Sequence, residues 1–293
     1  MKTETVTLKA TDGIINKGLL YNGEKTNKII ISIHGMATNC IKKRDEEIAK
    51  KAHEIKVDFL TFNNRGSEIV KYISYEHGKR KLGGTAFENV EECYYDIVGA
   101  INFCIQKGYN EIYLLGHSLG TTKIVYTYNK LIENKEEETL NKIKKVILLS
   151  LIDIPKVLQI YLNKDFANLL TYAKNLEKEH MENILMPEKS FIHPISVKTF
   201  LKYARDFENI NFARYSDEIY NFDELNKIKV PLFMRWGDTN EMVLQNLEDL
   251  CNKLKKKINN KNIDIGYIKD ANHSYKGKEE ILANQIQVFL NKK

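Results

Sequence analysis

Cysteine is scarce in this sequence, and its spacing argues against the usual cysteine-based metal sites. The 293 residues include four cysteines, Cys40, Cys93, Cys104 and Cys251, and no two are spaced as C-x-x-C. A zinc site is therefore not expected, and thiols scattered in this way indicate a reducing compartment. Cys93 and Cys104 fall within an apolar helical pattern, which predicts that they are core residues.

Long apolar runs are also absent. No run approaches the roughly 18 residues that would indicate a transmembrane helix. The first five residues, Met1 to Thr5, lack the apolar segment of a signal peptide. We therefore expect a cytoplasmic protein without a membrane span.

Net charge is modest, at +6 for the whole chain. The one lysine cluster, Lys253 to Lys257, lies at the end of an apparent helix, where the helix dipole favours cations. No aromatic side chains are interleaved with these lysines to stack on bases. The charge pattern therefore predicts no nucleic-acid partner.

Most of the chain alternates between short apolar runs and amphipathic helical patterns. This alternation predicts an α/β fold, with a mostly parallel sheet and helices on both of its faces. The polar segment 68–82 is expected to be irregular. An opening hairpin is predicted at 4–9 and 14–21, buried strands at 28–34, 57–62, 113–115, 145–151, 230–236 and 263–268, and helices at 42–55, 89–107, 121–131, 241–258 and 278–290.

The alternation stops after Asp153. Residues 154–222 contain no convincing buried strand and are helical and rich in aromatics. We interpret this segment as a helical cap, inserted at 153–224 between two parts of one α/β core, 1–152 and 225–293. Most of its aromatics are expected to pack the cap on the core, and a few to line a pocket at the domain boundary.

The segment that ends in Gly116-His117-Ser118-Leu119-Gly120 has the pattern G-x-S-x-G between a predicted strand and a predicted helix. A serine at so tight a turn is held in a strained conformation with its hydroxyl above the sheet edge. The flanking glycines are needed because a Cβ there would collide with neighbouring backbone. The helix that follows favours an anion forming beside Ser118. Ser118 is therefore the candidate nucleophile.

A serine nucleophile needs a base, and the base needs an acid that fixes its tautomer. With this motif the chain order is serine, acid, histidine. His180, His193 and His273 follow Ser118, and only His273 comes after the last predicted strand, at the same sheet edge. We therefore predict His273 as the base, and we expect the His117 side chain to point away from Ser118 and to serve in packing.

These residues resemble the α/β-hydrolase superfamily. The likeness includes the His34-Gly35 turn after a buried strand, the G-x-S-x-G segment, the loop after the strand at 230–236, and Asn272-His273-Ser274. Within the superfamily the chain looks most like cap-bearing serine hydrolases and DUF1749-type esterases, through Asn63-Asn64-Arg65-Gly66 and Gly83-Gly84-Thr85. The resemblance implies hydrolysis of a small-molecule ester or thioester without a cofactor or metal.

The acid is the point where the chain departs from this family. Its usual position holds Asn240, which cannot stabilise an imidazolium by charge, and Asp238 and Glu241 stand on either side. Asp153, after the strand at 145–151, is a third alternative. Each of the three could instead cap a helix or lie on the surface.

The remaining predictions concern the turn after the first buried strand and the polar residue that follows the next one. The resemblance predicts an oxyanion hole formed by the backbone amides of Met36 and Leu119. His34 is expected to hold its own loop. Arg65 either anchors the cap or substrate or, as we prefer, forms a salt bridge with a core carboxylate.

The sequence thus predicts a serine hydrolase, most simply a carboxylesterase that works through an acyl-enzyme on Ser118. Two alternatives stay open. One is a non-catalytic small-molecule receptor on the same fold, for which Asn240 is the main support. The other is an acyltransferase or peptidase. Substrate identity and oligomeric state are not predicted.

Overall fold

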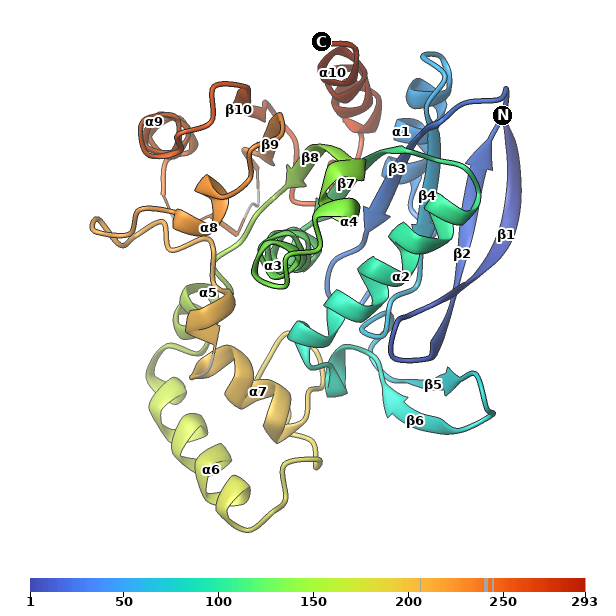
Figure 1. Cartoon of the computed structure of the whole chain (residues 1–293). Helices are drawn as coiled ribbons and strands as arrows, with labels where there is room; N and C mark the ends of the chain where they lie inside the picture. Colours follow the sequence, from blue (N-terminus) through green and yellow to red (C-terminus); the bar gives the residue numbers. More distant parts are fainter. Residues whose placement is uncertain (206, 240–241, 244, 293) are drawn as a thin grey trace.

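The computed structural model describes residues 1–205, 207–239, 242–243 and 245–292. Its described part contains one ten-stranded sheet with the strand order β10-β9-β8-β7-β3-β4-β2-β5-β6, and β1 pairs with β2 (Figure 1). The strands are β1 Lys2–Lys9, β2 Ile14–Asn22, β3 Lys28–Ile33, β4 Asp58–Phe62, β5 Lys71–Tyr75, β6 Arg80–Gly83, β7 Glu111–His117, β8 Ile143–Leu149, β9 Leu232–Gly237 and β10 Ile263–Ile268.

The sheet has a parallel part and an antiparallel part. Neighbouring strands from β10 through β7 and β3 to β4 are all parallel, and β1, β2, β5 and β6 pair antiparallel. β4 is buried along its whole length, because helices cover both faces of a parallel sheet. The α/β class and the mostly parallel central sheet predicted from the sequence are therefore confirmed.

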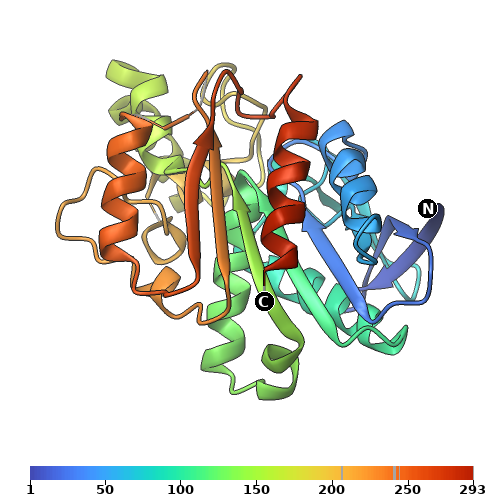
Figure 2. The same ribbon diagram turned by 90° about the horizontal axis from the view of Figure 1, so that it is seen from above.

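Helices cover both faces of the sheet (Figure 2). α1 and α10 pack together on one face over a core that includes Phe59 and Phe233, and α2, α3 and α9 cover the larger core on the other face. The bounds are α1 Lys43–His53, α2 Cys93–Gln106, α3 Leu119–Glu133, α4 Glu137–Lys142, α8 Asp223–Asn226, α9 Leu247–Lys257 and α10 Glu279–Asn291, with 3₁₀ turns at Thr85–Phe87 and Val90–Glu92. Cys93 and Cys104 lie in the larger core, as predicted.

Three helices, α5 (Ile154–Leu162), α6 (Phe166–Lys178) and α7 (Val197–Ala204), lie together to one side of the sheet (Figure 1). Among the described residues of this segment, 3₁₀ turns form at Asn163–Asp165 and Phe207–Ile210, and the β-structure consists of a single isolated bridge. Its buried aromatics stack on one another and continue the larger core of the sheet. We refer to residues 154–222 as the cap and keep its domain boundaries as a prediction.

One predicted segment is wrong. Residues 68–82, expected to be irregular, contain β5 and all of β6 except Gly83, and the two strands form an antiparallel hairpin at the edge of the sheet. Ile73 is buried, but Tyr72 and Leu82 are exposed, so the hairpin lacks the alternating pattern by which a half-buried strand is recognised. No helix in the described part of the chain is long and apolar enough to cross a membrane.

Candidate active site

Ser118 lies at the sharp turn between β7 and α3. Its φ of 54° and ψ of −126° are a strained backbone conformation for a residue with a side chain. The amide of Ser118 donates to the Leu149 carbonyl at 2.9 Å, and its carbonyl accepts from the amide and hydroxyl of Thr121 at 2.9 and 2.5 Å. Together these three bonds fix the backbone of the turn and hold the serine hydroxyl at the edge of the sheet.

Two glycines make this turn possible. A Cβ added to Gly116 would lie 2.5 Å from the Gly120 carbonyl oxygen, and one added to Gly120 would lie 2.2 Å from the Ile33 carbonyl oxygen. Both obstacles are backbone atoms, which cannot rotate away. Gly35 lies against the nucleophile itself, because a Cβ added to Gly35 would lie 3.0 Å from the Cβ of Ser118. The turn after β3 therefore packs directly on Ser118.

That turn carries Met36, one of the two predicted oxyanion donors, and Met36 and Leu119 line a cavity together with Ser118. The Nδ1 of His34 lies 2.8 Å from the Gly35 carbonyl oxygen. Burial, with the positive charge of Lys123, lowers the pKa of His34 to about 3, so the ring is neutral and donates from Nδ1. This bond fixes the Gly35–Met36 peptide plane, and with it the direction of the Met36 amide.

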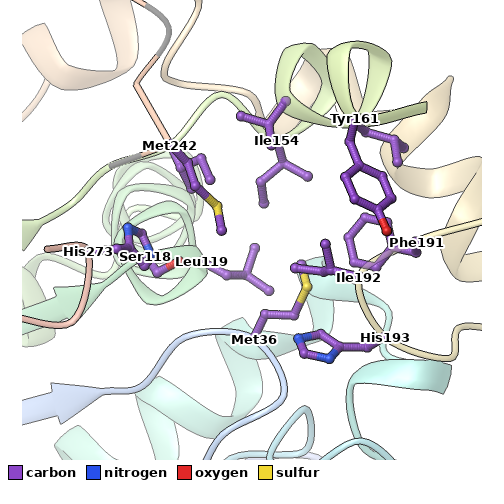
Figure 3. A pocket seen from close by; sticks show the side chains of 13 residues that line it. Met36, Ser118, Leu119, Ile154, Tyr161, Phe191, Ile192, His193, Met242 and His273 are labelled. Atoms are coloured by element: carbon purple, nitrogen blue, oxygen red, sulfur yellow. The ribbon is translucent and has the colours of Figure 1, made fainter. Parts of the chain in front are cut away.

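His273 lies on the loop after β10 and lines the same cavity as Ser118 (Figure 3). The view shows its ring beside Ser118, whereas His193 of the cap lies across the cavity, near Met36. The remaining histidine after Ser118 in the chain, His180, is exposed. The structure thus brings His273 and Ser118 together, as the chain order predicts.

His117 has a role that the sequence did not reveal. Its Nε2 lies 2.7 Å from the carbonyl oxygen of His273, and the two rings are 5.0 Å apart. Burial lowers the pKa of His117 well below its usual value, with the charges of Arg44 and His273 acting in the same direction. The neutral ring therefore donates from Nε2, and the residue next to Ser118 in sequence holds the loop that carries His273. The contact spans 156 positions, and no local pattern predicts it.

The three candidate acids differ in their surroundings. Asp238 is exposed, and its carboxylate accepts from the Thr239 hydroxyl at 3.2 Å. Asp153 is buried, caps α5, and accepts from the Asn211 amide nitrogen at 2.8 Å. Burial raises the pKa of Asp153. Glu241 lies outside the described residues, as does Asn240 at the usual position of the acid.

Arg65 lies in the core, only 2% exposed. Its guanidinium bonds Asp96 at 2.9 Å, Glu92 at 2.7 Å and Asp12 at 3.0 Å. The salt bridge to a core carboxylate, which we preferred, is therefore the correct alternative. Lys123, in the helix after Ser118, is likewise fully buried and pairs with Glu88. Breaking such buried pairs is expensive, so both residues stabilise the core around the turn.

Two cavities meet at Ser118. The first, of about 270 Å³, extends under the cap, and its other walls are almost entirely apolar. We call it the apolar lobe. The second, of about 360 Å³, extends the other way, between the start of α1 and the loop after His273, and is lined by cationic side chains. We call it the basic lobe. Met36, Ser118 and His273 line both lobes.

No cluster of three or more histidines, cysteines or acids suited to a metal occurs among the residues that the structure describes. A serine and a histidine that line one cavity can instead act as a nucleophile and its base.

Comparison with solved structures identifies the fold. The chain is similar to Est1E from Butyrivibrio proteoclasticus, solved with ferulic acid bound, at 17% identity and a TM-score of 0.65, with 97% of this chain and 98% of that one covered. It is also similar to the α/β hydrolase GrgF from Penicillium sp. sh18, at 16% identity and a TM-score of 0.66, with 99% and 98% covered.

A thermostable carboxyl esterase from Bacillus coagulans, solved with glycerol, gives 11% identity and a TM-score of 0.64, with 99% and 98% covered. No protein-family model and no curated protein matches the sequence. The chain therefore has the α/β-hydrolase fold along its whole length. The finer resemblance to DUF1749-type esterases stays a prediction.

Proposed function

We propose that this protein is a serine hydrolase that cleaves carboxylic esters or thioesters through an acyl-enzyme on Ser118. One observation carries the proposal: Ser118, at a strained strand-to-helix turn, and His273, 155 positions further along the chain, line one cavity. One of the solved structures named above is a carboxyl esterase, which supports an ester as the substrate. A fold alone does not establish an activity, so the proposal depends on the site.

In this mechanism the Ser118 hydroxyl attacks the ester carbonyl carbon while His273 takes its proton. The backbone amides of Met36 and Leu119 donate to the carbonyl oxygen as it becomes negative, and loss of one such donor typically costs about 3 kcal/mol. His273 then gives the proton to the departing alcohol or thiol. Water, deprotonated by His273, attacks the acyl-enzyme and releases the acid.

The first test replaces the nucleophile. We expect S118A to lower kcat for p-nitrophenyl butyrate by at least about 10³-fold, whereas S216A, at an exposed serine outside both lobes, should leave it unchanged. A fluorophosphonate probe should label Ser118 in the wild type, as located by peptide mass spectrometry. Undiminished turnover by S118A would overturn the assignment.

The same experiment separates the rival interpretations. A receptor on this fold should bind small esters saturably without turnover and give no probe adduct. An acyltransferase should form the adduct but pass the acyl group to an added alcohol faster than to water. The hydrolase predicts that water remains the preferred acceptor.

A further inference from the structure

The two lobes that meet at Ser118 differ in chemistry, and this difference bears on the substrate. An ester bound for attack places its carbonyl carbon beside the Ser118 hydroxyl, and its two halves must extend away on different sides. The apolar and basic lobes both include Ser118 and His273 in their walls. One half of the substrate can therefore occupy each lobe.

The apolar lobe suits a hydrocarbon group. Away from Ser118 and His273, its walls come mainly from the loop that follows β8 and from the cap. The residues are Ile152, Ile154, Val157, Leu158, Tyr161, Phe191, Ile192 and His193. Figure 3 shows Ile154, Tyr161 and Phe191 extending into the space opposite Ser118. Such a surface favours burial of apolar area, and away from Ser118 and His273 it offers a charged group only the polar atoms of Tyr161 and His193.

The basic lobe is lined by four cationic side chains, from Lys42, Lys43, Arg44 and Lys276, and by one acid, Glu279. Arg44 is buried and already bonded by Asp45, at 2.9 and 2.8 Å, so its charge is largely neutralised. The three lysines and Glu279 leave an excess of positive charge on the walls. Clefts lined by one sign of charge concentrate ions of the other sign.

The three lysines are available to a ligand. Among the residues that the structure describes, none of their ammonium groups forms an ion pair. Nearby Lys278, by contrast, pairs with Asp270 at 4.0 Å. Lys42 and Lys43 come from the start of α1, and Lys276 from the loop after His273. Cations from two segments thus flank the same cavity beside the nucleophile.

We propose that the substrate is an ester or thioester with one apolar half and one anionic half, the anion being a carboxylate or phosphate bound in the basic lobe by Lys42, Lys43 and Lys276. This proposal depends on the proposed hydrolase function and narrows it. The apolar half occupies the apolar lobe under the cap, and the bond between the halves lies at Ser118.

The test compares esters that differ only in charge. In one pair, 3-carboxyphenyl butyrate is set against 3-carbamoylphenyl butyrate, so that the leaving half is anionic or neutral. In the other, the mono-4-nitrophenyl ester of adipic acid is set against the 4-nitrophenyl ester of adipamic acid, so that the acyl half is anionic or neutral. We expect the anionic member of one pair to have a kcat/KM about tenfold higher. The pair that responds shows which half the basic lobe binds.

Variants connect this preference to the lysines. K42A/K276A should reduce the preference to less than about threefold, because it lowers kcat/KM for the anionic ester much more than for its neutral partner. K255A/K256A, which also removes two lysines but at the end of α9, should keep the preference. Raising NaCl from 0.1 to 1 M, which shortens the Debye length from about 10 to about 3 Å, should weaken the preference in the wild type.

Each result has a distinct meaning. Equal or lower kcat/KM for the anionic member of both pairs would overturn this proposal and leave the hydrolase intact. So would a preference that K42A/K276A does not change. If neither neutral nor anionic esters are cleaved and the fluorophosphonate probe fails to label Ser118, the hydrolase proposal itself is wrong.

Discussion

The two sides of the candidate site differ in how tightly the surrounding protein constrains them. On the side of the strand ends, backbone bonds hold Ser118 and the His273 loop, and a carbonyl oxygen lies 2.2 Å from where a Cβ of Gly120 would be. On the cap side, Tyr161 and Ile192 line the same cavity but are 51% and 46% exposed. Backbone contacts fix the reacting residues at the strand ends, whereas the cap supplies part of the wall of the cavity.

This contrast predicts where substitutions matter. A change at the strand ends meets backbone or removes a reacting group, and the protein cannot repack around it. A change in the cap removes part of a wall that solvent already reaches. The following predictions test that difference, in order of decreasing effect.

The largest effect concerns the acid. Asp238 is exposed and Asp153 is held by Asn211, so we predict Glu241 as the acid that pairs with His273. On this assignment we expect E241Q to lower kcat by about 10³- to 10⁴-fold, because a triad without its carboxylate loses the correct imidazole tautomer. D238N should change kcat by less than about threefold, because the Asp238 carboxylate is exposed. Steady-state kinetics with p-nitrophenyl butyrate measure both. A large loss in D238N with a small one in E241Q would reverse the assignment.

Asp153 provides the third arm of that comparison. Its carboxylate is engaged by Asn211 and by the amide of Lys156, the latter at 3.3 Å. We therefore expect D153N to retain most of its activity. A loss as large as that of E241Q would show that the acid follows β8 instead of β9.

The next effect is on stability. We expect G120A to lower the free energy of unfolding by about 3 kcal/mol or more, since its Cβ would overlap the Ile33 carbonyl oxygen. G266A is the matched control, because the nearest atoms to its Cβ belong to the Arg235 side chain, at 3.6 Å. Its cost should stay under about 1 kcal/mol. Urea unfolding of both variants measures the difference, and equal costs would contradict the expected constraint.

A smaller effect depends on pH. His34 has a pKa of about 3 in the fold, so between pH 3 and its usual value near 6.5 the unfolded chain binds a proton that the folded chain does not. Stability should therefore fall as pH drops through this window, by about 1.4 kcal/mol per pH unit for this residue. H34N, whose amide can still donate to the Gly35 carbonyl, should show a shallower slope.

A histidine of the cap, His193, serves as the comparison for the pH dependence of stability. Burial also lowers the pKa of His193, but its side chain is only partly buried. H193N should therefore change the slope less than H34N does. Urea unfolding between pH 5 and 7.5 gives both slopes, and a larger change in H193N would place the tighter constraint in the cap.

The smallest effects are expected at the cap wall. Y161A and I192A should change the free energy of unfolding by less than about 1 kcal/mol, because both side chains are half exposed. KM for an ester with an apolar half should rise a few-fold, with kcat nearly unchanged, because contacts made equally in the ground and transition states affect binding alone. V288A, at an exposed position of α10, should change neither value.

The same contrast explains what the sequence could predict. The buried strands and the turn at Ser118 have local signals, namely β-branched runs and two glycines that backbone contacts require. The β5–β6 hairpin has no such signal, because Ile73 and Gly83 are the only buried residues in these two strands. The bond from His117 to His273 depends on how distant loops meet, which no local pattern contains.

The acid and the substrate were beyond sequence reasoning for different reasons. The usual position of the acid holds Asn240, so the pattern itself was broken. The basic lobe combines the start of α1 with the loop after β10. Its lysines look like ordinary surface charges until the fold brings them together beside Ser118.

The bond between the His117 ring and the His273 backbone ties the two ends of the proposed proton transfer to each other through a single side chain. The distance between Ser118 and His273 is therefore set by segments at the ends of the strands, and no residue of the cap takes part in this bond. Substitutions in the cap can therefore change which substrate fits during evolution, while the spacing between Ser118 and His273 is conserved.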